Sequence, residues 1–435
     1  TQYRTLILLE PQLIVILILY LAVEAVEQFL LMLNLKHLSR HGAEMPPGFK
    51  AHVDAAILTK MRNYTVARGR LGRIEAVLST GITIIFLFGG LLNGLNNLIA
   101  TRGWTPVISG VVFFMILIYT NTLIKIPFSL YSTFSLEKRF GFTNETLSLW
   151  VQDLLKSLFV NTLLAVFLLY GVLWLVMALP DMWWLAGWVF ILLFIIFLLY
   201  VSPYVIEPLF NKFSPIEDAA LEERIKQIMS RIGLKINRVF SMDASKRSSH
   251  SNAYFTGIGH VKRIVLFDTL LSNHADDEII TILAHEAGHW KKKHVLKMLA
   301  FSQVVALIGF YAAYRLTAGD FLTELFRLDI PSMHAKLLLV SFIGTLVLFP
   351  LKPLWAYLSR RHEIAADNFA VQLTQMPVPM ANALIKLGKD NLANLHPHPW
   401  FAALYYSHPP LTQRVQRILA AKDNGLHESV LSLKK

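Results

Sequence analysis

The residues best suited to chemistry are His285, Glu286 and His289, which form the pattern His-Glu-x-x-His. On a helix the two histidines lie about 40° apart around the axis, so their rings can share one metal ion. Glu286 lies beside them, where its carboxylate can accept a proton from a water on that metal. The pattern predicts a zinc site built for peptide hydrolysis. The alternative is an amphipathic helix whose surface carries these three side chains by chance.

A catalytic zinc site needs a third protein ligand and an open position for water. The metzincin pattern would place glycine and histidine where this chain has Lys292 and Val295, and His294 lies about 140° off the ligand face of an unbroken helix. A carboxylate on a separate helix is the other solution, and Glu363 fits it. Asp367 lies one turn further on the same face, where it can accept the second ring N–H of a ligand histidine. Without the upstream motif, both acids would indicate a solvated helix face.

The composition indicates a membrane protein that crosses the bilayer several times. Of the 435 residues, 54% are hydrophobic and 16% are charged, and the mean hydropathy of +0.49 is too high for an ordinary soluble protein. A net charge of +12 would suit nucleic acid, but in a membrane protein it more simply reflects basic cytoplasmic loops, so no nucleic-acid partner is expected. Cysteine is absent, which excludes disulfides and thiolate zinc ligands.

Seven apolar stretches of about 20 residues are long enough to span a bilayer. They cover residues 8–33, 76–100, 107–130, 155–179, 183–205, 296–316 and 337–358. The expected fold is a mainly α membrane protein with a small α+β, gluzincin-like zinc protease domain on its cytoplasmic side. Its expected segments are 1–213 with five spans, 214–294 with the catalytic motif, 295–358 with two spans, and 359–435 with the third ligand.

The distribution of basic residues sets the expected orientation. The loop after the first span is rich in Lys and Arg, whereas the loops after the second, fourth and sixth spans carry few. The positive-inside rule then places the N-terminus outside and the C-terminus in the cytoplasm. His289 and Glu363 lie only a few residues from the sixth and seventh spans, which puts them within roughly 10 Å of the bilayer boundary. The expected substrates are therefore membrane-attached or lipidated peptides.

The chain resembles the type I CAAX prenyl endopeptidases, a family of membrane-embedded zinc metalloproteases. Beyond the zinc motifs, the similarity rests on Glu-Pro-Leu-Phe-Asn-Lys-Phe at 207–213, His-Ser-Asn-Ala-Tyr-Phe-Thr-Gly at 250–257, Ser-Arg-Arg at 359–361, and Ser-His-Pro-Pro-Leu at 407–411 with Arg414. The resemblance implies seven helices around an internal chamber and cleavage near a prenylated C-terminal cysteine. The compact length favours a bacterial homologue in the cell inner membrane; a eukaryotic one would occupy the endoplasmic reticulum membrane.

The resemblance also implies that His408 and Arg414 lie near the metal. An N–H donor there could stabilise the oxyanion formed when the peptide carbonyl is attacked, which makes His408 a candidate catalytic residue. Arg414 could act in the same way or could support the fold. The complete expected site therefore combines one zinc ion per chain, the general base Glu286 and the supporting residues Asp367 and Arg414.

A strand expected at 253–258 precedes the zinc helix, and an exposed strand edge can pair with an extended peptide backbone. Asn252, Ala253 and Tyr254 are therefore the candidate substrate-binding residues; an ordinary sheet strand is the alternative. The expected partners are a peptide or protein substrate and the lipid bilayer. Two other functions stay open. One is a membrane quality-control protease with the same chemistry, and the other is a seven-span receptor or transporter.

Overall fold

The computed structural model describes residues 10–256 and 261–423. Within them, seven helical stretches are long and apolar enough to cross a membrane, which confirms the predicted number of spans. They run over Pro11–His41, Ala55–Phe88, Pro106–Phe140, Leu147–Ala178, Trp183–Phe210, His294–Thr317 and Met333–Thr374. Their most apolar segments are at most 22% buried inside the protein, so most of this apolar surface requires lipid or an internal space to cover it.

The second span differs most from its predicted range of 76–100. Helix α2 (Ala55–Phe88) begins about six turns earlier, because its first half carries Lys and Arg side chains that a hydropathy pattern does not recognise. The helix ends before Gly90, whose φ of +89° is a left-handed conformation that glycine adopts without steric cost. The rest of the predicted span forms a separate short helix, α3 (Leu91–Ala100).

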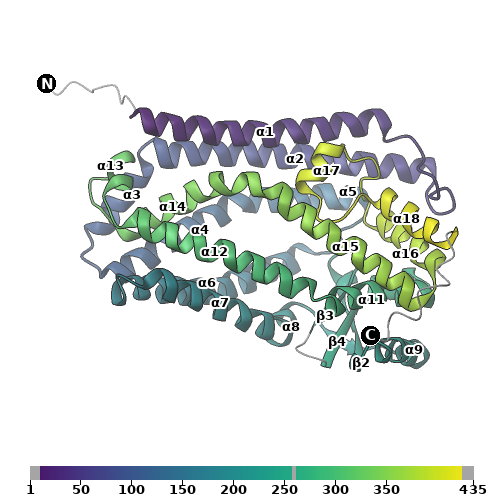
Figure 1. Cartoon of the computed structure of the whole chain (residues 1–435). Coiled ribbons are helices and arrows are strands. Elements are labelled where there is room, and N and C mark those ends of the chain that lie inside the picture. Colours follow the sequence, from purple (N-terminus) through teal and green to yellow (C-terminus); the bar gives the residue numbers. More distant parts are fainter. Residues whose placement is uncertain (1–9, 257–260, 424–435) are drawn as a thin grey trace.

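The other long helices of the membrane part run roughly alongside one another, and short helices lie between them in the chain (Figure 1). They are α1 (Pro11–His41), α4 (Pro106–Tyr131), α5 (Lys138–Phe140), α6 (Leu147–Ala178), α7 (Trp183–Val201), α8 (Glu207–Phe210), α12 (His294–Thr317), α13 (Phe321–Leu325), α14 (Met333–Leu348) and α15 (Lys352–Thr374). A cavity of about 930 Å³ opens among α2, α3, α4 and α14. A larger chamber enclosed by all seven spans stays a prediction.

The remaining elements gather at one end of the long helices (Figure 1). Four strands form a sheet in the order β1-β2-β4-β3, in which β2 and β4 are parallel and the other neighbours are antiparallel. The strands are β1 (Phe213–Pro215), β2 (Lys235–Met242), β3 (Ala253–Thr256) and β4 (Val261–Phe267). Strand β3 starts where it was predicted, and residues 257–260, which include the predicted end of the strand, lie outside the described residues.

Six helices surround this sheet or connect it to the membrane part. They are α9 (Ala219–Ser230), α10 (Asp268–Asn273), α11 (Asp276–Lys291), α16 (Pro377–Asp390), α17 (Pro399–Tyr405) and α18 (Leu411–Asp423). Helix α11 buries Ile279, Ile280 and Leu283 in the same apolar core as residues of β2, β4 and α9. This burial fixes the helix that carries His-Glu-x-x-His, because rotating it would expose these side chains.

Candidate metal centre

Helices α11 and α15 pack closely enough to bring their polar side chains together. At Gly288 on α11, an added Cβ atom would lie 3.1 Å from the Cα of Ala366 and 3.1 Å from the ring of Phe369 on α15. A side chain here would force α15 to move by a few tenths of an ångström, so glycine favours this close approach. Acidic residues occupy the first turn of α11, where their negative charges interact favourably with the positive end of the helix dipole. One of them, Glu278, accepts a hydrogen bond from the backbone N–H of Ala275.

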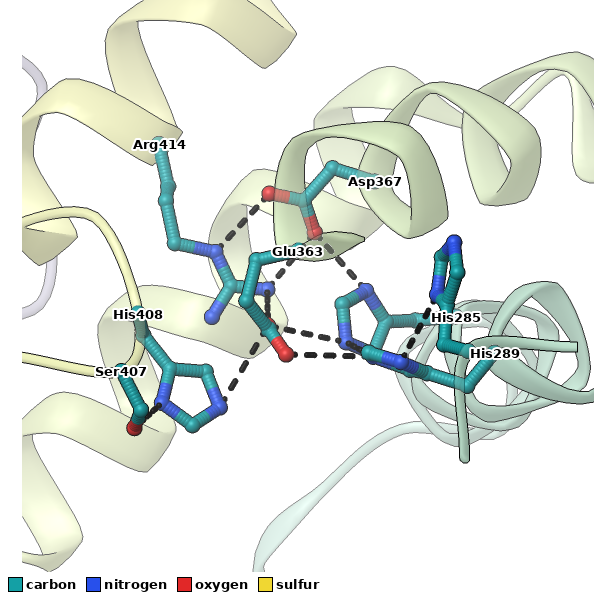
Figure 2. A network of polar contacts seen from close by, with 8 residues as sticks. His285, His289, Glu363, Asp367, Ser407, His408 and Arg414 are labelled. Carbon is teal, nitrogen blue, oxygen red and sulfur yellow. Dashed lines mark hydrogen bonds and ion pairs between the residues drawn. The ribbon is translucent and has the colours of Figure 1, made fainter. Parts of the chain in front are cut away.

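The ligand groups of three side chains from the two helices converge, as Figure 2 shows. His285 Nε2 lies 3.1 Å from His289 Nε2 and 3.3 Å from Glu363 Oε2, and His289 Nε2 lies 3.2 Å from Glu363 Oε1. A tetrahedral zinc ion with bonds of about 2.0–2.2 Å keeps its ligand atoms about 3.3–3.6 Å apart. Within the described residues, these three side chains form the only group of at least three such residues with geometry for a metal ion. Two imidazoles and one carboxylate also match the donors that zinc accepts.

A buried chain of polar contacts holds His285 in position. Its Nδ1 atom lies 2.8 Å from Asp367 Oδ1, on the side of the ring away from the convergence point. The Asp367 carboxylate in turn accepts hydrogen bonds of 2.8 and 2.6 Å from Arg414 Nε and Nη2. Asp367 is 5% exposed and Arg414 is 9% exposed, so water scarcely competes for these contacts. The structure thus links the two residues that were predicted beside the zinc ligands.

The protonation of His285 depends on these same neighbours. Burial alone would lower the pKa of its imidazole, but the contacts with Asp367 and Glu363 outweigh burial and raise that pKa to about 9. The site therefore has a strong affinity for a cation, which is a proton when no metal is bound. A metal ion that binds His285 Nε2 must displace this proton, so metal affinity should increase with pH.

The second ring nitrogen of His289 contacts a residue that sequence reasoning set aside. His294 Nδ1 lies 3.1 Å from His289 Nδ1, and the His294 ring stacks on that of His362 with 4.1 Å between centroids. The prediction assumed an unbroken helix, but α11 ends at Lys291 and Lys293 takes a φ of +56°. This turn redirects His294 towards His289. The run of three lysines at 291–293, between the two helical patterns, is the only feature of the sequence that could indicate this break.

Glu286 faces a small cavity beside the ligands. The cavity has a volume of about 120 Å³, and its wall also includes Asn252, Ala253, His408 and Arg414. Burial raises the pKa of Glu286 above the usual carboxyl value, although His285 and His289 oppose this shift. A half-buried carboxylate with a raised pKa next to a cation site has the properties of a general base.

Of two further predicted residues, one lies near the centre and the other points away from it. His408 lies in the segment between α17 and α18, with Nε2 at 3.4 Å from Glu363 Oε2 and Nδ1 at 2.9 Å from Ser407 Oγ. More than half of its side chain is accessible, so it can meet a substrate. Tyr254 points elsewhere: its hydroxyl donates a 2.6 Å hydrogen bond to Glu207 Oε2. Successive side chains of a strand alternate between faces, so Ala253 can line the cavity while Tyr254 cannot.

Strand β3 lies at the end of the sheet order, with β4 on one side and no other described strand on the other. Helix α11 packs against the same strand, and Ala253 lines the cavity beside Glu286. Asn252, just before the strand, accepts a hydrogen bond from the N–H of Ala253 through its own side chain. The free edge leaves backbone groups that an extended peptide could pair with.

Comparison with known proteins gives concordant matches over most of the chain. Residues 34–212 match the family model for the N-terminal, five-helix membrane part of CAAX prenyl proteases, and residues 215–422 match the model for peptidase family M48. CAAX prenyl protease 1 of Saccharomyces cerevisiae is 32% identical over 86% of this chain and 88% of its own length. A CAAX prenyl protease 1 homolog of Arabidopsis thaliana is 35% identical over 68% of this chain and 70% of its own length. The crystal structure of S. mikatae Ste24p superposes with a TM-score of 0.87 and 29% sequence identity. The match covers 94% of this chain and 99% of the Ste24p chain.

Proposed function

This chain belongs to peptidase family M48 and is a multi-pass membrane metalloendopeptidase, and we propose that its metal is a zinc ion held by His285, His289 and Glu363. The observation that carries the proposal is that the Nε2 atoms of His285 and His289 lie 3.1 Å apart and each lies 3.2–3.3 Å from one oxygen of the Glu363 carboxylate, close to the spacing that zinc requires. The receptor or transporter alternative is set aside by the family match.

Each residue around the metal then has a distinct role. The bound zinc ion would polarise the scissile carbonyl and make a water acidic. Glu286 accepts the proton of the attacking water and delivers it to the leaving amine. Asp367 holds His285 through Nδ1, so that Nε2 presents its lone pair to the metal. His408 donates its N–H to the oxyanion, and Arg414 keeps Asp367 in place.

The proposed substrate is a prenylated peptide at the cytoplasmic membrane surface. Relatives that span most of the chain are named CAAX prenyl proteases. The metal site also lies next to the ends of two membrane spans, since α12 begins five residues after His289 and Glu363 is part of α15. A peptide that pairs with the edge of β3 at Asn252 and Ala253 would pass beside Glu286. The basic residues at the end of α1 and in the first half of α2 support an N-terminus outside and a C-terminus in the cytoplasm.

A pair of otherwise identical peptides tests this substrate. One carries a farnesyl group on the cysteine of a C-terminal CAAX sequence, and the other has a free cysteine. We expect purified full-length protein to cut the farnesylated peptide with a kcat/KM at least about tenfold higher, and a zinc chelator to abolish cutting. Equal chelator-sensitive cutting of both would overturn the prenyl preference and favour general membrane proteolysis. Cutting that persists in chelator would overturn the metal chemistry itself.

Replacing Asp367 by alanine should weaken metal binding without removing a metal ligand. Its carboxylate orients the His285 ring, and losing such a partner costs about 10–100-fold in metal affinity or activity. The measurement is a competition titration with a fluorescent zinc chelator. Exposed Glu217 provides a matched control, because Glu217→Gln also removes an acid from the catalytic end. Equal zinc affinity in Asp367→Ala and the parent protein would contradict this role.

A further inference from the structure

A second cavity lies beside the metal centre, where the chain passes from α11 into α12. It has a volume of about 610 Å³, and none of the residues that line it is acidic. Its lining includes five cationic side chains: Lys291, Lys292, Lys293, Lys297 and Arg361. We call this cavity the cationic pocket. Lys291 Nζ donates to the carbonyl of Ile232, and the other four cations have no carboxylate partner among the described residues. An unneutralised group of this kind attracts an anion.

The backbone adds to this positive charge. Lys293, which precedes α12, takes a left-handed φ of +56°, and no side chain caps the first turn of the helix. The first N–H groups of a helix have no partner within the helix, and its N-terminal end carries a partial positive charge. In this 24-residue helix the uncapped end coincides with the lysines of the pocket. The helix end therefore reinforces the preference for an anion that the side chains establish.

The cationic pocket lies directly beside exposed apolar side chains at the start of a membrane span. The sixth membrane span begins at His294, inside the pocket wall, and the next two residues, Val295 and Leu296, are 63% and 60% exposed. On α15, Leu354 and Trp355 are also exposed, one to two turns before Arg361. Charged groups at one level and exposed apolar groups at the adjoining level match a molecule with an anionic head and hydrocarbon chains.

We propose that the cationic pocket binds the headgroup of an anionic phospholipid, whose acyl chains lie against the exposed apolar side chains of α12 and α15. Free phosphate shares the negative charge, but it gains nothing from Val295, Leu296 or Trp355. The pocket shares His294 with the metal centre, where His294 Nδ1 lies 3.1 Å from His289 Nδ1. A lipid bound here would therefore hold the catalytic end of the protein to the bilayer beside a proposed metal ligand.

Native mass spectrometry of the full-length protein, released from detergent, tests the proposal. The protein is titrated with phosphatidylglycerol and with phosphatidylcholine of the same acyl chains. We expect one phosphatidylglycerol to bind at least about tenfold more tightly than phosphatidylcholine, because several cations each attract the headgroup. The double variant Lys292→Gln/Lys297→Gln should lose most of this preference. The double variant Lys235→Gln/Arg238→Gln removes the same charge from exposed positions of β2 and should keep it.

The outcomes separate the possible ligands. If Lys292→Gln/Lys297→Gln binds phosphatidylglycerol as the parent protein does, or if both double variants lose the preference equally, the proposal is wrong. A third titration adds inorganic phosphate to the phosphatidylglycerol complex. Displacement of the lipid at phosphate concentrations comparable to those of the lipid would assign the pocket to a soluble anion instead. Persistence of the complex under those conditions supports the phospholipid.

Discussion

Replacement of Glu286 by glutamine is expected to abolish peptide cleavage while the protein still binds one metal ion. Glutamine keeps the size of the side chain, but it cannot accept the proton of the attacking water. General-base catalysis typically contributes about 10²–10⁴-fold in rate, so kcat should fall by at least this factor. The three proposed metal ligands lie on other residues, and within the described part of the chain Glu286 makes no hydrogen bond or ion pair with them. The measurement combines kcat on a fluorogenic peptide with zinc content by elemental analysis.

The control for this variant is Glu217→Gln, which makes the same chemical change at an exposed position before α9. It should keep both activity and zinc. Substantial activity in Glu286→Gln would show that another group accepts the proton, and the assignment of the base would be wrong. Loss of zinc together with activity would instead mean that Glu286 supports the metal site.

Replacement of Glu363 by glutamine is expected to remove both the metal and the activity. Glu363 is 5% exposed and supplies the only anionic group among the three proposed ligands. A neutral amide binds zinc much more weakly than a carboxylate, and two histidines alone do not make the three-ligand set of a catalytic zinc site. After dialysis against a chelator, zinc content should fall far below one ion per chain. The parent protein and Glu286→Gln should both retain it.

This comparison distinguishes a ligand from a base, since both variants are inactive for different reasons. Excess zinc should restore part of the activity of Glu363→Gln, because the base and the two histidines are still present. It should not restore Glu286→Gln. Full zinc occupancy and normal cleavage in Glu363→Gln would require a different third ligand, for which His408, at 3.4 Å from Glu363 Oε2, would be the first residue to examine.

The parts of this site that could be predicted are those encoded by local spacing. His285 and His289 follow from helical periodicity, because the burial of Ile279 and Leu283 keeps α11 regular and fixes which face they share. Glu363 and Asp367 follow from the same period on α15. The close packing of their helix against α11 is favoured by Gly288, whose role is visible only when both helices are in place.

The parts that could not be predicted depend on breaks in regular structure. The left-handed backbone conformation of Lys293 directs His294 towards His289. No periodic pattern in the sequence indicates such a turn at a lysine. The break at Gly90 divides what hydropathy shows as one span. The hydrogen bond from the Tyr254 hydroxyl to Glu207 joins residues 47 positions apart, which no local pattern indicates. Contacts between distant segments and single residues at positive φ are decided by tertiary packing.

X-ray diffraction from crystals of the zinc-loaded protein, recorded above and below the zinc absorption edge, tests the proposed metal centre directly. We expect one anomalous peak per chain, within about 2.0–2.2 Å of His285 Nε2, His289 Nε2 and a Glu363 carboxylate oxygen. The peak should disappear below the edge, which identifies the element. A zinc peak elsewhere, or no peak between α11 and α15 in crystals of active protein, would contradict the proposed centre.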